Sequence, residues 1–361
     1  MVSSVVVGGG PAGSVAAKTL AQSGDVAVFE EHESQPVQCA GIISISGLES
    51  LGIDPGDSVV NKVSGARFYS PEGRVVELRP GKEMAYVVDR RRFDEILLQE
   101  AVDAGASLYR ERVVGVSQGI VKSASRSIEA DRIILASGVD YGFHRRLGLD
   151  YPARFLVGAQ ADVQGDFDPD FCEVHFNVPG FFSWIIPAGD TARIGLCAYS
   201  NPAPLLNSFI KKFRADGRLK KNKPKNRVYG IIPIYNPALK ADYGFIRTVG
   251  DAAGQVKATT GGGVVLGCAA AKLVGEKDYE RAWRKKIGKE LSLHLKIRGS
   301  VDKLNAKNTD LFFDLLEAGA HALEGGGDMD LASKNLASVF LDPTFMGTLI
   351  YHAPRLMLSL L

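Results

Sequence analysis

The sequence predicts an α/β protein with a parallel sheet, an inserted antiparallel β domain and a helical C-terminal region. A βαβ pattern opens the chain, because apolar runs at residues 4–7 and 26–29 flank an alanine-rich helical segment at 13–23. Short β segments broken by Gly, Pro and Asp follow at 155–199, a pattern typical of an antiparallel sheet. Beyond Asp278 the periodicity is helical to the end of the chain.

An antiparallel hairpin is expected to interrupt the α/β pattern. Its strands are residues 65–69 and 75–78, and the Ser-Pro-Glu-Gly sequence between them is a turn signal. The remaining α/β elements are expected as helices at 91–104 and 264–274 and as strands at 132–136 and 247–250. The chain is therefore expected to leave the parallel sheet and return to it twice.

Length and composition are those of a folded globular protein of about two domains. The chain has 361 residues, of which 45% are hydrophobic and 23% charged, which excludes a disordered or fibrous protein. A net charge of +2 argues against a surface committed to nucleic acid, and we expect no nucleic-acid partner. The four cysteines lack C-x-x-C spacing, which argues against disulfides, zinc and iron–sulfur clusters, so no metal is expected.

A glycine-rich turn directly after the first strand predicts a dinucleotide site. It fits G-x-G-x-x-G, in which the first glycine permits a tight turn, the second admits a pyrophosphate and the third lets helix and strand pack. The residues of this turn are Gly8, Gly10, Pro11, Ala12 and Gly13. Glu30 closes the second strand 22 residues after Gly8, where a carboxylate would accept the hydroxyls of an adenosine ribose.

A second glycine-rich turn indicates which dinucleotide is bound. Gly250 and Asp251 follow a strand, and the run Gly261, Gly262 and Gly263 precedes a helix. An aspartate after a strand can hold the other end of a long cofactor, and bare amides at a helix start suit an electron-rich ring. This pattern is typical of flavoproteins. No second G-x-G-x-x-G lies between residues 14 and 250, so no separate nicotinamide domain is expected.

Three segments resemble the FAD motifs of the flavoprotein group that contains aromatic hydroxylases and geranylgeranyl reductases. They are the N-terminal fingerprint and residues 88–94 and 250–254. Two further segments are similar to signatures of the geranylgeranyl reductase family, which includes the archaeal digeranylgeranylglycerophospholipid reductases. Residues 36–41 read P-x-x-C-x-G and residues 182–187 read aromatic-x-W-x-apolar-P. The similarity covers about residues 1–275.

The resemblance implies a FAD-dependent reductase that saturates C=C bonds of a geranylgeranyl or other prenyl chain in archaeal isoprenoid lipid biosynthesis. By the same resemblance Asp251 binds the ribityl or pyrophosphate portion of FAD, and Arg90 lies near the pyrophosphate. Cys39, followed by Ala40 and Gly41, is expected to face the flavin and is the candidate proton donor. The other interpretation of Cys39 is a buried, inert thiol.

The substrate side of the site is expected at residues 182–187. Phe182, Trp184 and Pro187 would form an apolar wall for a prenyl chain, or would simply be core residues. Two positions depart from the family pattern. Ala188 stands where a lysine is common, which leaves the substrate headgroup open, and Ser137 stands where many members carry an aspartate, which weakens a hydroxylase assignment.

Two other functions remain open at this point. One is a flavin monooxygenase of an aromatic or quinone-like substrate, and the other is a flavin electron carrier to a quinone pool. Residues 291–361 contain no cysteine, which argues against the carrier, because such proteins often append a cluster domain. A reductase would need an external electron donor, such as ferredoxin, NAD(P)H or a deazaflavin.

The expected domain boundaries follow from these motifs. The FAD-binding domain comprises residues 1–58, 84–150 and 243–277, the substrate domain comprises the hairpin segment 59–83 and residues 151–242, and the helical region comprises 278–361.

Location and membrane contact can also be predicted. No basic segment precedes the apolar run at 5–7, which indicates a cytoplasmic protein. The apolar tail 345–361 would either lie on a membrane or pack on the core. Residues 205–227 contain nine bases and one acid, and the basic stretch 211–227 is expected as a solvated loop or as a contact with anionic phospholipid. The protein is therefore expected to be peripheral at most.

Overall fold

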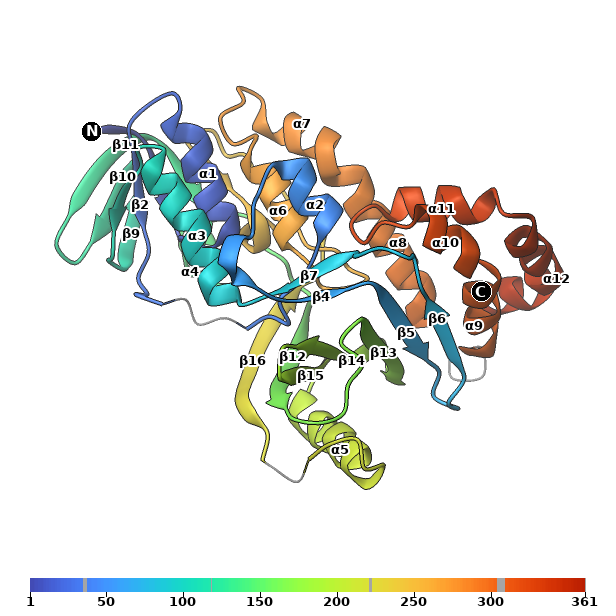
Figure 1. Cartoon of the computed structure of the whole chain (residues 1–361). Coiled ribbons are helices and arrows are strands. Elements are labelled where there is room, and N and C mark those ends of the chain that lie inside the picture. Colours follow the sequence, from blue (N-terminus) through green and yellow to red (C-terminus); the bar gives the residue numbers. More distant parts are fainter. Residues whose placement is uncertain (35–37, 118, 221–222, 304–308, 361) are drawn as a thin grey trace.

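Two seven-stranded sheets and a C-terminal group of helices make up the chain (Figure 1). The structure, a computed structural model, describes residues 1–34, 38–117, 119–220, 223–303 and 309–360. It confirms the predicted fold class, because parallel and antiparallel sheets are combined with helices at the C-terminus.

The first sheet contains the βαβ unit predicted at the N-terminus. Its order is β8 (Ser107–Tyr109), β2 (Val26–Phe29), β1 (Val2–Val7), β11 (Ser127–Leu135), β10 (Ile120–Ser123) and β9 (Val113–Ser117), and β17 (Ile246–Thr248) also pairs with β11. The pairs among β8, β2, β1, β11 and β17 are parallel, whereas β10 pairs antiparallel with β9 and β11. Val5 of β1 lies between Ala27 of β2 and Ile133 of β11. The parallel strands come from three separate parts of the chain.

Alternate residues of β1 belong to two hydrophobic cores, because successive side chains of a strand point to opposite faces. Val6 packs in one buried cluster with residues of three helices, α1 (Pro11–Ala21), α3 (Arg90–Asp103) and α6 (Val264–Ala271). Val5 and Val7 pack in a second cluster with Phe143 of α4 (Gly142–Leu147). Helices therefore cover the sheet on both faces.

A third, small sheet has three strands and is antiparallel. It has the order β3 (Ile42–Ser44), β7 (Ala85–Val88) and β4 (Val59–Val63), and α2 (Ile45–Leu51) follows β3 directly. The short helix η1 (Gly56–Ser58) precedes β4. Strand β4 begins the segment 59–83 and pairs with β7 rather than with the hairpin that follows it.

The second large sheet is the antiparallel one. Its order is β16 (Lys225–Pro233), β12 (Phe155–Val163), β15 (Thr191–Ala198), β14 (Phe181–Ala188), β13 (Phe171–Val178), β5 (Gly65–Tyr69) and β6 (Val75–Leu78). Strands β5 and β6 form the predicted hairpin, and β5 joins the sheet by pairing in parallel with β13. Residues far apart in the sequence thus share one sheet.

Helix α5 (Pro202–Ala215) covers one face of this second sheet. Its buried Leu206, Phe209 and Phe213 pack against Ile185 and Ile194. The expectation of a solvated loop over 211–227 is therefore wrong at both ends of the segment, because α5 extends to Ala215 and β16 begins at Lys225. The reason is that apolar residues at three-to-four spacing within the basic segment give α5 a face to bury.

The C-terminal region is helical, as predicted. It consists of α7 (Tyr279–Trp283), the π-helical turn η3 (Arg284–Gly288), α8 (Lys289–Lys303), α9 (Thr309–Ala318), α10 (Ala320–Gly326), α11 (Ala332–Phe340) and α12 (Pro343–Leu360). Helices α9 and α10 contact β6, and Figure 1 shows the group beside the hairpin end of the second sheet. Among the described residues, no helix has both the length and the apolar character needed to cross a membrane.

Candidate functional site

The first glycine-rich turn joins β1 to α1. Of the three glycines of its G-x-G-x-x-G motif, only one has room for a side chain. Gly8 has φ +105°, and a Cβ there would lie 2.4 Å from the Ala136 carbonyl oxygen. A Cβ on Gly13 would lie 2.0 Å from the Gly8 carbonyl oxygen. In contrast, a Cβ on Gly10 would meet no atom within 4 Å. Gly8 and Gly13 are thus required for packing, whereas Gly10 opens onto space at the start of α1, where a phosphate group could approach.

Glu30 connects this turn to the end of β2. Its side chain is buried, with Oε2 accepting the Gly9 N–H at 2.7 Å and Oε1 accepting the His32 N–H at 2.9 Å. The Nδ1 atom of His32 lies 2.9 Å from the same Oε1. The carboxylate therefore stands directly beside the glycine-rich turn, at the position predicted for a ribose contact, and that role stays a prediction.

The second glycine-rich turn touches the first. Gly250, with φ +67°, follows β17 within the short helix η2 (Gly250–Ala253), and a Cβ on it would lie 2.9 Å from the Ala12 Cβ. Gly263 precedes α6, and a Cβ there would lie 2.8 Å from Asp251 Oδ1. The start of α1, Asp251 and the start of α6 are therefore neighbours, although more than 230 residues of sequence separate the two turns.

Arg90 lies close to Asp94 and to two functional candidates, Cys39 and Asp251, at this junction. Its Nε and Nη2 donate to Asp94 Oδ1 and Oδ2 at 2.9 and 3.1 Å. Burial opposes the Arg90 charge, but Asp94 and then Cys39 raise the pKa of the guanidinium above its usual value. Burial also raises the pKa of Asp251, and Arg90 partly offsets that rise. Arg90 is therefore paired with Asp94, and its charge also reaches Cys39 and Asp251.

Cys39 is held by the antiparallel sheet. Its Sγ accepts the Gly41 N–H at 3.3 Å, and its carbonyl oxygen accepts from Gln160 Nε2 at 3.4 Å. The Gln160 Oε1 in turn accepts from Trp184 Nε1 at 3.1 Å. Trp184 and Cys39, which belong to two separate sequence signatures, are therefore linked through one glutamine. Pro36 and Val37 of the cysteine signature lie outside the described residues.

Arg193 makes a second link between this sheet and the Cys39 loop. Its Nη1 donates to the carbonyl oxygens of Ala40 at 2.6 Å and Val88 at 2.9 Å. A Cβ on Gly41, which has φ +76°, would lie 2.2 Å from the same Nη1 atom, so glycine is required there. Sequence reasoning missed both Arg193 and Gln160. Neither belongs to a motif, and an isolated polar residue in a β strand carries no signal of its partner.

Glycines also mark the sheet face that carries Gln160 and Arg193. A Cβ on Gly195 would lie 2.5 Å from the indole ring of Trp184, and one on Gly230 would lie 2.9 Å from Gln38 Oε1. Gly158 pairs with Gly230 in the strand register. At these glycines no side chain rises from the sheet, so the indole ring and the Cys39 loop can lie directly on its backbone.

The predicted substrate residues divide between the two faces of β14. Phe182 and Trp184 lie on the face that carries Gln160, are half-buried, and have ring centroids 6.3 Å apart. Pro187 is buried on the opposite face, because it is an odd number of residues from Trp184 in a continuous register. Ala188 is half-buried at the end of the strand, and the Ser137 hydroxyl donates to the Asp140 carbonyl oxygen at 2.9 Å.

Comparison with known proteins identifies the family. No protein-family model matches the chain. Digeranylgeranylglycerophospholipid reductase 2 of Methanopyrus kandleri is 33% identical over 87% of this chain and 90% of the relative. The reductase 2 of Methanothermobacter thermautotrophicus is 30% identical over 87% of this chain and 91% of the relative.

The chain belongs to the digeranylgeranylglycerophospholipid reductase family.

Solved structures share the fold of this reductase-family chain. A geranylgeranyl bacteriochlorophyll reductase-like protein of Thermoplasma acidophilum matches with a TM-score of 0.80 at 21% identity, and the match covers 98% of each chain. The halogenase PltM in complex with phloroglucinol and FAD has a TM-score of 0.67 at 16% identity, over 99% of this chain and 85% of that one. The fold is therefore one that FAD-dependent enzymes use.

The C-terminal region of this reductase also contacts the second glycine-rich turn, through the side chain of Lys257. Lys257 is buried beneath Gly262, and its Nζ donates to Asp330 Oδ1 at 2.5 Å and to the Met329 carbonyl oxygen at 3.0 Å. The Ser44 hydroxyl, which caps α2, also donates to Asp330. Asp330 thus connects the C-terminal region to two loops of the first part of the fold.

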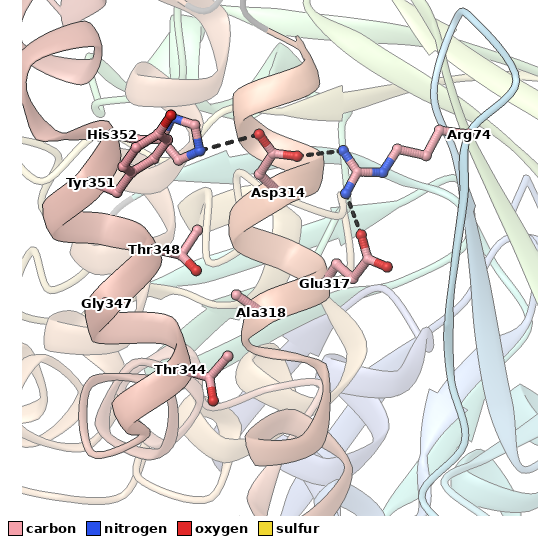
Figure 2. A pocket seen from close by; sticks show the side chains of 9 residues that line it. All are labelled: Arg74, Asp314, Glu317, Ala318, Thr344, Gly347, Thr348, Tyr351 and His352. Carbon is pink, nitrogen blue, oxygen red and sulfur yellow. Dashed lines mark hydrogen bonds and ion pairs between the residues drawn. The ribbon is translucent and has the colours of Figure 1, made fainter.

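A pocket of about 540 Å³ lies elsewhere, between α9, α12 and the β5–β6 turn (Figure 2). Charged side chains line part of it, and Figure 2 shows Arg74 between Asp314 and Glu317 with His352 on the other side of Asp314. None of its lining residues belongs to the two glycine-rich turns or to the Cys39 loop.

Proposed function

We propose that this protein is a FAD-dependent reductase that saturates C=C bonds of a geranylgeranyl or related prenyl chain in archaeal isoprenoid membrane-lipid biosynthesis. Family membership supports the reaction, since its relatives are digeranylgeranylglycerophospholipid reductases. The observation that carries the proposal is the convergence of three parts of the chain. The two glycine-rich turns meet at Ala12 and Gly250, and Trp184 is linked to Cys39 through Gln160.

The residues at the two turns fit FAD. The open space at Gly10 and the start of α1 suit the pyrophosphate, and Glu30 suits the adenosine ribose. Asp251 would hold the ribityl portion or the pyrophosphate, and Gly261, Gly262 and Gly263 would lie beside the flavin ring. Arg90 supplies a positive charge near these groups, although its guanidinium is already paired with Asp94. The other residues of the first turn, Gly8, Pro11, Ala12 and Gly13, shape the start of α1.

Reduction of an alkene needs a hydride and a proton on its two carbons. Reduced FAD would supply the hydride, and the protein must supply or position the proton. Cys39 is the proposed proton donor, with Ala40 and Gly41 shaping the loop against the cofactor. Because its sulfur accepts the Gly41 N–H, the thiol proton remains available for donation. Gln160 and Arg193 would orient this thiol by holding the loop backbone.

The substrate and the partners follow from the same site. Phe182 and Trp184 would contact the prenyl chain, whereas Pro187 would support the strand from its buried face. Ferredoxin, NAD(P)H or a deazaflavin would reduce the FAD between turnovers. Two exposed surfaces support peripheral membrane contact: the lysines at the end of α5, and Ile350 and Tyr351 on α12, which are 68% and 80% exposed.

An anaerobic assay with chemically reduced enzyme tests the function. Wild-type protein should raise the mass of a digeranylgeranylglycerol phospholipid by two hydrogens for each double bond reduced. Cys39→Ser should lower the rate at least tenfold without loss of bound FAD, and Cys172→Ser, a half-buried cysteine on β13, is the matched control. Oxygen-dependent NAD(P)H consumption with a hydroxylated product would instead indicate a monooxygenase. Electron transfer to a quinone with unchanged lipid would indicate a carrier.

A further inference from the structure

The antiparallel sheet leaves an apolar stripe partly uncovered on the face that carries Gln160. On β13 and β14 several side chains of this face are half-buried, whereas Ile186 of the same face is buried against the small sheet and the side chains on the α5 face are buried. The half-buried residues of the stripe are Val174, Phe176, Phe182 and Trp184. Cys172 lies outside the stripe, because it packs with Ile186 against the small sheet. The stripe begins at Trp184, which is linked to Cys39, and is therefore continuous with the proposed active site.

A row of aromatic rings leads along this stripe to the C-terminal helices. The ring centroid of Trp184 is 6.3 Å from that of Phe182, which is 6.3 Å from that of Phe176. Phe176 in turn lies 5.0 Å from Phe312 and 5.7 Å from Phe313, both on α9. Phe313 is fully buried, and Phe312 is half-buried. The row therefore ends where α9 meets β13.

Ion pairs on the side of α9 away from the aromatic row hold this helix against the β5–β6 hairpin and α12. Arg74, in the turn between β5 and β6, donates to Asp314 at 2.5 Å and also to Glu317 (Figure 2). The Nε2 atom of His352 on α12 lies 3.2 Å from Asp314 Oδ2. Because Asp314 is two residues from Phe312, these contacts hold the helix turn that carries the aromatic ring.

We propose that this stripe is the floor of a prenyl-binding groove, and that Phe176 and Phe312 form the end wall of the groove and limit the length of the chain that it accepts. The proposal rests on the reductase function proposed above. A hydrocarbon chain is the occupant that fits, because the row consists of aromatic rings and continues from the Cys39 site. The carboxylates of Asp314 and Glu317 point instead to the Arg74 side of α9 (Figure 2). A smaller side chain at Phe312 would lengthen the groove by opening its far end.

A binding competition tests the end wall. FAD-loaded protein is mixed with equal amounts of a four-unit and a five-unit prenyl alcohol, and native mass spectrometry measures which one is retained. Phe312→Ala should raise the ratio of five-unit to four-unit alcohol about tenfold, since misfit groups in an apolar pocket change discrimination by roughly that factor or more. Phe340→Ala is the matched control, because Phe340 is 50% exposed on α11 and lies outside the row. It should leave the ratio unchanged.

Several outcomes overturn the proposal. An unchanged ratio in Phe312→Ala, or the same change in Phe340→Ala, shows that Phe312 does not limit chain length. A wild-type protein that retains neither alcohol shows that the groove does not hold prenyl chains. If Phe312→Ala does not fold, Phe312→Leu must shift the ratio in the same direction by a smaller factor. Retention of the alcohols with the expected shift, but no reduction of any prenyl lipid, would contradict the proposed function and leave the end wall supported.

Discussion

At the scale of single residues, the glycines of the candidate site are of two kinds. At some of them only a hydrogen atom fits, whereas at one of them the space for a side chain is empty. Gly13 is of the first kind, because its Cβ would lie 2.0 Å from a carbonyl oxygen. Gly10 is of the second kind, with φ −69° and no atom within 4 Å of an added Cβ. The same motif therefore contains one glycine that serves packing and one that leaves space for a ligand.

This difference predicts opposite behaviour of two alanine variants. Gly13→Ala should destabilise the protein by about 1–3 kcal/mol through overpacking and should also lose FAD. Gly10→Ala should change the free energy of unfolding by no more than about 0.5 kcal/mol, because Ala tolerates its backbone conformation. Its FAD affinity should nevertheless fall about tenfold, as the methyl group enters the proposed phosphate space. Urea unfolding of the apoprotein and flavin fluorescence titration measure the two quantities. Unaltered FAD affinity in Gly10→Ala would contradict the proposed phosphate position.

At the scale of elements, strands and helices from different parts of the chain hold one another at the site. The β15 residue Arg193 holds the ends of the Cys39 loop and of β7. The C-terminal region inserts Asp330 between Lys257 and Ser44. The Lys257 and Asp330 side chains are only 8% and 6% exposed, so neither charge is well solvated without the other.

Removal of one member of this ion pair should therefore be costly. Asp330→Ala leaves the Lys257 ammonium buried with the Met329 carbonyl oxygen as its remaining partner and should destabilise the protein by about 3–5 kcal/mol. Replacing both residues, by Lys257→Met together with Asp330→Leu, should recover most of that loss, because no unpaired charge remains. Urea unfolding of the FAD-loaded proteins gives both values. An Asp330→Ala variant as stable as the wild type would show that the pair does not hold the C-terminal region in place.

At the scale of the whole molecule, charge and burial are distributed unevenly. Seven of the eight charged residues at 1–60 are acidic. In contrast, the exposed end of α5, the connection after it and the start of β16 carry several cations, among them Lys211, Lys212, Lys220 and Lys225. Figure 1 places α5 at the opposite end of the molecule from α7. If the protein binds anionic lipid, we expect the surface at the end of α5 to make the contact.

Vesicle binding tests this polarity. Protein should co-sediment with phosphatidylglycerol vesicles and less with phosphatidylcholine, and salt should weaken the binding. Lys211→Glu with Lys212→Glu should lower the affinity roughly 30-fold or more, since each surface cation contributes about 1 kcal/mol. The matched control is Lys285→Glu with Lys286→Glu, an exposed pair in η3 next to α7. Equal loss in both double variants would show that net charge, and not the α5 surface, governs binding.

Three buried histidines predict how stability depends on pH. Burial lowers the pKa of His144, His175 and His294 below the usual value of 6.5. The unfolded chain then binds more protons than the folded protein below about pH 6.5, so the free energy of unfolding must fall as the pH decreases through that range. The slope should be up to about 1.4 kcal/mol per pH unit for each histidine.

Denaturant unfolding at about pH 7.5 and about pH 5.5 measures this slope. His144→Phe should reduce the slope by up to the contribution of one histidine, about 1.4 kcal/mol per pH unit. His321→Gln, at an exposed position, should leave the slope unchanged. Stability that is constant or greater at the lower pH would show that these histidines do not titrate as buried groups.

The sequence by itself determined the α/β order of elements, the β5–β6 hairpin, both glycine-rich turns and the family, because each depends on local spacing or on contiguous motifs. It could not show that Gln160 links Trp184 to Cys39, that Arg193 holds the Cys39 loop, or that Pro187 lies on the other face from Trp184. It also assigned residues 211–227 to a loop, although packing against the sheet stabilises the last turn of α5 up to Ala215 and β16 begins at Lys225. Only the tertiary structure decided these points. A hydrogen bond or ring contact between residues distant in the chain depends on strand register and docking, and no local pattern encodes its partner.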